Sequence, residues 1–240
     1  MKAPLPHTEA ARVAALHEYR ILDTLPEPAY ADLTRLASEI CRTPIGLVAL
    51  IDSDRQWFKS RGGLDVAQTP RNIAFCAHAL FDTELLVVRD TTHDERFADN
   101  PFVTAAPHIR LYAGAPLVSH DGQVLGTLCV LDSEPRELTS DQMEALRALA
   151  REVIAQLALR RKVSDLQTAV AERERAEAQL RVRAEQGAHY QTVLLDLARS
   201  PVTDLESALR MTGASAYLTK PLDVDHFLAT VEGFLAGARK

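Results

Sequence analysis

The sequence predicts an α+β fold in which a mostly antiparallel sheet is flanked by helices and followed by a long helix and a short, incomplete βαβα tail. Apolar residues repeat at three and four positions before residue 41, strand-like runs crowd the segment 45–132, and neither proline nor glycine interrupts residues 140–185. Helical periodicity on both sides of a strand-rich region is typical of a layered domain with one face of its sheet covered.

Two helices are expected at the start of the chain. Thr8 is placed to cap the first, which we expect to end near Asp23 because two prolines follow. The second helix carries apolar side chains on one face up to Cys41, and Pro44 stops it.

Two hairpins form the predicted sheet. The apolar run 45–51 indicates a buried strand, and residues 56–60 are expected to return beside it. The clearer hairpin joins YAGAPLV (112–118) to VLGTLCVLD (124–132) through the turn SHDG.

The segment between the hairpins is mixed. Residues 73–80 (IAFCAHAL) repeat at three and four positions and are expected to form a helix, whereas residues 85–90 favour a strand. The polar stretch 91–101 is expected to be a loop, and loops on a rigid scaffold often carry binding groups.

One long helix is predicted from Ser140 to about residue 185. An apolar seam at alternating steps of four and three positions favours a parallel homodimer through this helix. If the same register continues, however, it places Arg173 and Glu177 in the core of the coiled coil. The alternative is a solvated or back-folded helix that charge pairs stabilise. The seam consists of Leu159, Val163, Leu166 and Val170.

The remaining tail is short. Gly187 is expected to break the helix, and only two βα units fit after it, which is too few for a doubly wound sheet. We therefore expect three parts: an α+β domain over 1–139, a helix over 140–187 and a partial domain over 188–240.

The composition makes several classes of function and location unfavourable. The net charge is −6 and basic residues alternate with acidic ones, so nucleic acid is an unfavourable partner. The start of the chain lacks the apolar stretch of a signal peptide and no run of about 18 apolar residues follows, so we expect no membrane span and a cytoplasmic location. The three cysteines lack metal or disulfide spacing and are interpreted as buried small hydrophobes.

Several sequence motifs between Arg20 and Asp132 resemble, in the same order along the chain, motifs of the GAF domains of bacterial sensor histidine kinases and diguanylate cyclases. These motifs include RILDT, PIGLVALID, FCAHA, VVRDTTHDERFADNP and GTLCVLD. This resemblance implies a central antiparallel sheet, a ligand pocket between the sheet and its loops, and helices on the other face that continue into a signalling helix.

The tail resembles the end of a response-regulator receiver domain. The segment GASAYLTKPLD matches the usual strand and loop of that family, and Lys220 stands at the position of the family's phosphate-contacting lysine. The acidic pair and the phosphate-accepting aspartate that a receiver needs are missing, so we interpret the tail as a remnant of a larger hybrid protein.

Five residues are candidates for lining a ligand pocket, because they combine aromatic walls with a few polar groups. They are Trp57, Phe75, His78, Arg110 and Tyr112. Trp57 and Phe75 also fit a plain core role. Arg110 is expected to meet an internal carboxylate, Asp90 or Asp94, in a salt bridge or to meet the ligand. Nothing in the sequence names a ligand or a cofactor.

These observations predict a sensor that binds a small molecule and passes the signal through its helix to two-component signalling proteins. Because kinase, cyclase and phosphate-acceptor motifs are missing or incomplete, the chain is not expected to be an enzyme. Two alternatives stay open: a thiol-based reductase of the methionine sulfoxide type that uses the cysteines, and a ligand-free dimerisation scaffold from a truncated hybrid histidine kinase.

Overall fold

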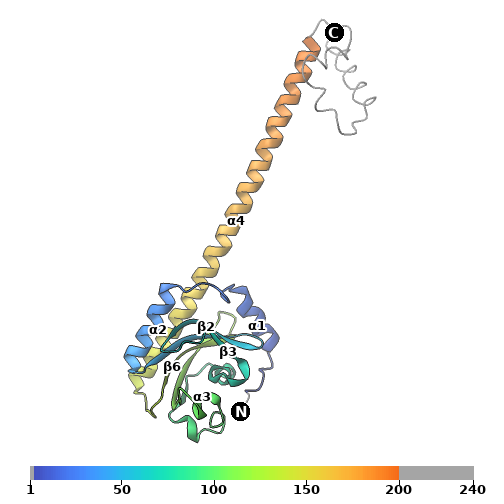
Figure 1. Cartoon of the computed structure of the whole chain (residues 1–240). Helices are drawn as coiled ribbons and strands as arrows, with labels where there is room; N and C mark the ends of the chain where they lie inside the picture. The colour runs from blue at the N-terminus through green and yellow to red at the C-terminus, as the bar shows by residue number, and fades with distance from the viewer. Residues whose placement is uncertain (1–2, 200–240) are drawn as a thin grey trace. The chain divides into compact units, whose positions relative to one another are not determined.

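The structure, a computed structural model, describes residues 3–199. Residues up to Leu166 form one compact unit and residues from Gln167 onward belong to a second. The first unit contains the whole sheet and the helices packed on it (Figure 1).

Six strands form one antiparallel sheet in the order β3-β2-β1-β6-β5-β4. The strands are β1 (Ile45–Ile51), β2 (Arg55–Gly62), β3 (Gln68–Pro70), β4 (Leu86–Val88), β5 (Leu111–Val118) and β6 (Val124–Asp132). This arrangement confirms the predicted α+β class. Both predicted hairpins are present, and the short strand β3 is an addition at the edge.

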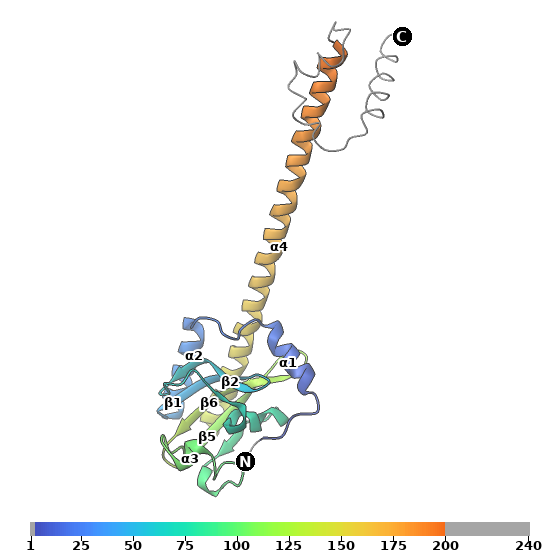
Figure 2. The same ribbon diagram turned by 45° about the vertical axis from the view of Figure 1, so that its right-hand side comes forward.

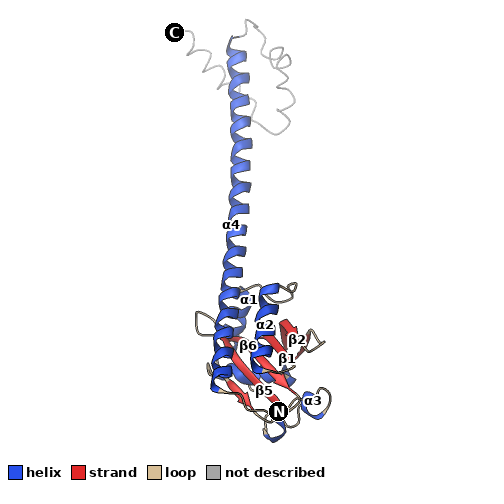
Figure 3. Ribbon diagram, turned by 90° about the vertical axis from the view of Figure 1, so that its left-hand side faces the viewer, coloured by secondary structure: helices blue, strands red, loops and turns tan. Residues whose placement is uncertain are grey.

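Helices cover one face of the sheet. They are α1 (Glu9–Glu18), α2 (Pro28–Cys41) and the first part of α4 (Ser140–Arg199), and Figures 1 and 3 show them on the same side of the strands. Side chains alternate across β1: Val48 and Leu50 pack in the helix-side core, whereas Leu47 and Ala49 pack in a second core on the opposite face. The period of two therefore divides the domain into two apolar layers.

Short turns and loops cover the opposite face (Figure 2). They include the 3-10 segments η1 (Arg71–Ile73), η2 (Phe75–Phe81) and η3 (Thr91–His93) and the one-turn helix α3 (Pro101–Thr104). Phe75 stacks on Phe97 and on Tyr112, with ring centroids 4.8 and 5.5 Å apart. These aromatic contacts fasten η2 and the loop after η3 to the sheet.

A glycine allows close contact at the centre of the sheet. A Cβ atom at Gly126 of β6 would overlap the carbonyl oxygen of Ala49 on β1. Only glycine therefore fits between these two strands without a backbone shift.

Two predicted segments differ in the structure. Residues 73–80 form 3-10 turns instead of an α-helix. The long helix runs through Gly187 to Arg199, so the break expected at Gly187 is wrong, and residues 192–198, where the first strand of the βαβα tail would fall, are helical instead. One glycine costs a helix only about 1 kcal/mol relative to alanine, which is too little to end it. The predicted receiver-like segments after residue 199, with Lys220, lie outside the described residues.

The seam on α4 faces solvent in the single chain. Leu159, Val163 and Leu166 have exposed fractions of 57, 45 and 66%. Further along the helix, Arg173 and Glu177 form an ion pair one turn apart. In the part of the chain that the structure describes, no helix has the length and apolar character needed to cross a membrane.

Candidate functional site

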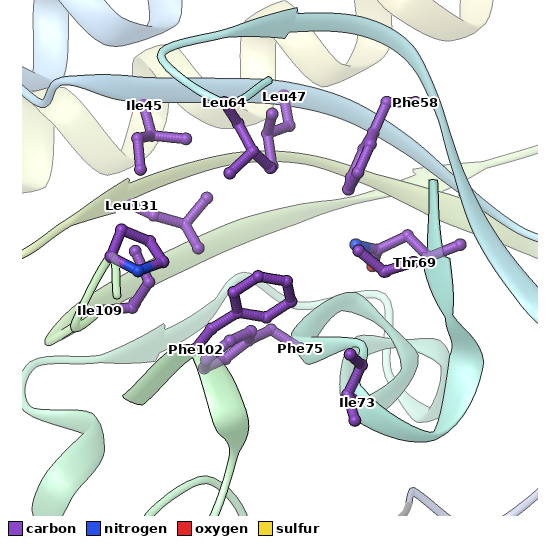
Figure 4. Close-up of a pocket in the computed structure, with 12 residues that line it drawn as sticks. Ile45, Leu47, Phe58, Leu64, Thr69, Ile73, Phe75, Phe102, Ile109 and Leu131 are labelled. Carbon is purple, nitrogen blue, oxygen red and sulfur yellow. The ribbon is translucent and has the colours of Figure 1, made fainter. Parts of the chain in front are cut away.

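A small cavity lies between the sheet and the loops that cover its second face. Figure 4 shows Phe58 and Leu47 of the sheet on one side of it and Phe75 and Phe102 on the other. Its full lining is Ile45, Leu47, Gln56, Phe58, Leu64, Thr69, Ile73, Phe75, Phe102, Pro107, Ile109 and Leu131. The free space is about 30 Å³, which is enough to hold a water molecule.

Gln56 and Thr69 are the two polar members of this lining. The Gln56 amide nitrogen donates to the Thr69 hydroxyl at 3.4 Å, and both residues are buried. The carbonyl oxygen Oε1 of Gln56 is buried and has no hydrogen-bond partner within residues 3–199. The cavity therefore combines apolar walls with one unused acceptor.

Of the five residues predicted to line a pocket, Phe75 lies in the cavity wall. Tyr112 is fully buried behind it, and His78 meets the Phe97 ring edge-on at 4.8 Å between ring centroids. Trp57 lies on the other face of the sheet, in the core beneath the helices. The structure thus brings three of the five together and separates Trp57 from them.

Arg110 lies near this group but differs from the expectation. Its guanidinium donates to the carbonyl oxygens of Val103 and Ile109, at 3.1 and 2.9 Å. Asp90 and Asp94 bond within their own loops, so the expected salt bridge is absent from the described residues. The backbone carbonyls of Val103 in α3 and of Ile109 accept hydrogen bonds from the cation instead of a carboxylate.

A contact between two cysteines was missed by sequence reasoning. The sulfur atoms of Cys76 on η2 and Cys129 on β6 lie 3.7 Å apart, and both side chains are buried. Among the described residues, the hydroxyls of Tyr112 and Thr127 have no hydrogen-bond partner, and both approach the Cys76 thiol. Nothing in the sequence joins positions 53 residues apart, so only the fold reveals this cluster.

The two thiols are not equivalent. Burial opposes ionisation of Cys76, but the Cys129 thiol and the nearby hydroxyls of Thr127 and Tyr112 lower its pKa below the usual value. The hydrogen bond to Cys76, together with burial, raises the pKa of Cys129 well above its usual value. Cys76 is therefore the more readily ionised member of the pair.

A cluster of charges holds η1, and with it one end of the cavity, against α1. Glu9 binds the guanidinium groups of both Arg12 and Arg71. Arg12 also donates to the Ile51 carbonyl at 2.7 Å, although its side chain is almost completely buried. Since Ile73 of η1 lines the cavity, the cluster fixes one wall of the site.

A second polar cluster lies on the helix side of the sheet. The side chain of Lys59 on β2 is fully buried, and its ammonium donates to Glu27 at 2.6 Å and to the Leu25 carbonyl at 2.7 Å. Arg160 of α4 donates to the same oxygen of Glu27 at 3.0 Å. Burial alone would raise the pKa of Glu27, but these two cations hold it below its usual value. Among the described residues, no group of three or more His, Cys, Asp or Glu side chains could hold a metal ion.

The family model for the GAF domain matches residues 10–157, so the chain belongs to the GAF domain family. Two solved structures of GAF domains are among the chains that match this one. That of phosphoenolpyruvate-protein phosphotransferase from Acinetobacter is 14% identical, covers 64% of this chain and 95% of its own, and has a TM-score of 0.48. The blue-light absorbing form of the PixJ GAF domain from Thermosynechococcus elongatus is 14% identical, covers 70% of this chain and 96% of its own, and has a TM-score of 0.47.

A curated relative corrects one expectation. A cyclic di-GMP phosphodiesterase of Pseudomonas aeruginosa is 35% identical over 213 residues, which are 88% of this chain. This relative is named as an enzyme, which overturns the expectation from missing motifs that the chain is not one. The chain spans 36% of the relative's length.

Proposed function

We propose that the chain is a cytoplasmic sensory module whose GAF domain binds a small molecule in the cavity beneath Phe58 and passes the bound state to α4. Membership of the GAF family supports a sensory role. The cavity and α4 occupy opposite faces of one sheet, so a signal has to pass through a strand.

Two neighbouring residues of β2 carry this proposal. Phe58 lines the cavity, and Lys59 points to the other face, where Glu27 joins it to Arg160 of α4. The pairing of β1 with β2 shifts at this point, since Ala49 opposes Phe58 and Val48 opposes Ser60. At a bulge of this kind the extra residue is left unpaired and the hydrogen-bond ladder is locally disrupted. A guest that moves Phe58 would therefore move Lys59 and its contact with α4.

We further propose that α4 pairs with a second copy of the chain through its seam. Leu159, Val163 and Leu166 are apolar, exposed and spaced for parallel pairing. A change in the position of Arg160 would then also move Leu159 of the seam, because the two residues are adjacent in α4.

The relative suggests what the module regulates. We propose that the GAF domain controls an enzyme activity of the kind that the relative's name gives, the hydrolysis of cyclic di-GMP. The similarity over 88% of this chain supports this assignment.

Filling the cavity tests the sensory proposal without knowledge of the ligand. Leu64 lines the cavity and Val66 in the same loop is exposed, so Leu64→Trp should imitate a bound guest and Val66→Trp is its matched control. Hydrogen exchange of residues 158–166 is expected to change in the first variant only. Equal exchange in both variants and in the wild-type chain would refute transmission to α4.

The Cys76–Cys129 contact favours a second candidate function, thiol-based reduction of a sulfoxide. The Cys76 thiolate would attack the sulfoxide, whose sulfur–oxygen bond breaks, to give a sulfide and a sulfenic acid on Cys76. Cys129 would displace water to form a disulfide, and an external dithiol would restore both thiols. The burial of both sulfurs is the obstacle to this chemistry.

Peptide mapping after mild peroxide treatment distinguishes this candidate. It predicts a Cys76–Cys129 disulfide that a dithiol reverses, while the buried Cys41 stays reduced as an internal control. Two unmodified thiols would exclude it and leave the sensory proposal intact.

A further inference from the structure

We propose that the cavity beneath Phe58 selects a small, neutral, mainly apolar molecule with one N–H or O–H donor, and that it rejects phosphates and carboxylates. This inference rests on the proposed sensory function and specifies its ligand class. It follows from the lining, from one unpaired acceptor and from the size of the cavity.

The lining carries no charged side chain. Ten of its twelve members are apolar, and the other two are Gln56 and Thr69. Taking a phosphate or carboxylate from water into such a site costs free energy unless a cation or several donors meet it. The neighbouring cations are engaged elsewhere, since Arg71 binds Glu9 and Arg110 binds backbone carbonyls. Cyclic dinucleotides and other nucleotides therefore do not match the chemistry of this cavity.

One polar atom of the lining, Oε1 of Gln56, is a buried hydrogen-bond acceptor. Gln56 is 6% exposed, and its Oε1 atom accepts no hydrogen bond from the part of the chain that the structure describes. Its amide nitrogen is already used, because it donates to Thr69. A buried acceptor without a partner is unfavourable, so a guest that brings a hydrogen-bond donor gains more than a purely apolar guest of the same shape.

The size of the cavity limits the guest. The free space of about 30 Å³ admits little more than a water molecule. Leu64 and Phe102 are the partly buried members of the lining that pack against the second core, and their displacement would admit a single ring. Only a compact guest is compatible with so small a rearrangement.

The test compares four probes in nuclear magnetic resonance titrations of the full chain. Phenol offers a ring and one hydroxyl donor, toluene has the same shape without the donor, benzoate adds a charge, and cyclic di-GMP represents the anionic nucleotides. Phenol is expected to shift the signals of Phe58, Phe102 and Gln56 and to bind about two- to tenfold more tightly than toluene, the equivalent of one net hydrogen bond. Benzoate and cyclic di-GMP are expected to leave these signals unchanged.

A variant pair assigns the preference to its cause. Gln56→Met keeps the length of the side chain and removes the acceptor, whereas Gln167→Met makes the same change at an exposed position. The first variant should bind phenol and toluene equally, and the second should behave as the wild-type chain. Toluene binding by Gln56→Met would also show that the variant keeps its cavity.

Different results overturn different claims. Binding of benzoate or cyclic di-GMP beneath Phe58 would overturn the ligand class and leave the sensory function standing. Phenol affinity that Gln56→Met leaves unchanged would overturn the role of the acceptor. If neither phenol nor toluene perturbs the lining, the inference fails, and the exchange experiment with Leu64→Trp decides separately on the sensory function.

Discussion

Lys59 and Arg160 bind the same carboxylate oxygen of Glu27, at 2.6 and 3.0 Å, although one belongs to the central sheet and the other to α4. Lys59 has no contact with solvent, and its ammonium lies 5.1 Å from the centre of the Tyr30 ring. A buried ammonium is tolerated only where acceptors surround it. Glu27 is therefore both a structural partner of the sheet and its connection to α4.

Glu27→Gln is expected to lower the free energy of unfolding by about 1–3 kcal/mol, because the buried Lys59 loses its charged acceptor. Denaturant unfolding measures this change. Glu39→Gln on α2 is the matched control, since Glu39 pairs with Arg35 at the exposed surface, and it should leave stability unchanged. Equal stability of both variants would show that Glu27 does not support Lys59.

Stability is expected to fall in acid through Glu9. Burial alone would raise its pKa, but hydrogen bonds and charge from Arg12 and Arg71 lower the pKa from 4.5 to about 2. Because the folded pKa lies below the unfolded one, this stabilisation is complete above pH 4.5 and is lost as the pH falls towards 2. After allowance for solvent screening it amounts to about 1–2 kcal/mol.

Unfolding of the wild-type chain and of Glu9→Gln between pH 6 and pH 3 checks this prediction. The difference in stability between the two proteins should shrink as the pH decreases. A difference that stays constant over this range would contradict the assignment to Glu9.

Two glycines are expected to respond to alanine in opposite directions. A methyl group at Gly126 meets the backbone of β1, so Gly126→Ala should destabilise the domain by about 1–3 kcal/mol. Gly187 lies inside α4 with open space around it, so Gly187→Ala should stabilise the helix by about 0.5–1 kcal/mol. Circular dichroism melts of both variants test the contrast, and a stabilising Gly126→Ala would refute the close approach of β1 and β6.

The exposed seam of α4 is expected to control self-association. Leu159→Lys combined with Leu166→Lys places charges in the proposed interface and should weaken the dimer by a factor on the order of a hundred or more. Thr168→Lys combined with Ala171→Lys adds the same charge at positions outside the seam and should leave association unchanged. Sedimentation velocity provides the measurement, and unchanged sedimentation of the leucine double variant would exclude the seam.

The strands whose formation depends on the local pattern of apolar residues could be predicted from the sequence. The apolar run at β1 and the hairpin of β5 and β6 appear at the expected positions, because strand alternation is encoded within each segment. The prediction that the helix ends at Gly187 was wrong, because one residue of low helix propensity does not end a helix whose neighbouring residues favour it. The family resemblance implied a pocket between the sheet and its loops, and the cavity beneath Phe58 lies in that position, while its role in ligand binding stays a prediction.

The composition of the site depended on contacts between distant segments. Phe58 and Trp57 are neighbours in the sequence, yet only Phe58 reaches the cavity, and the period of two on β2 carried a signal for this separation. No such signal existed for the contact of Cys76 with Cys129 or for the carbonyls that hold Arg110. These contacts arise from loops whose paths follow from tertiary packing.

The most direct test of transmission measures hydrogen exchange of residues 158–166 in four proteins: the wild-type chain, Leu64→Trp, Glu27→Gln and the double variant. The account predicts that Leu64→Trp changes exchange in α4 when Glu27 is present and has no effect on α4 when Glu27 is replaced. An equal change in both backgrounds, or no change in either, would contradict it.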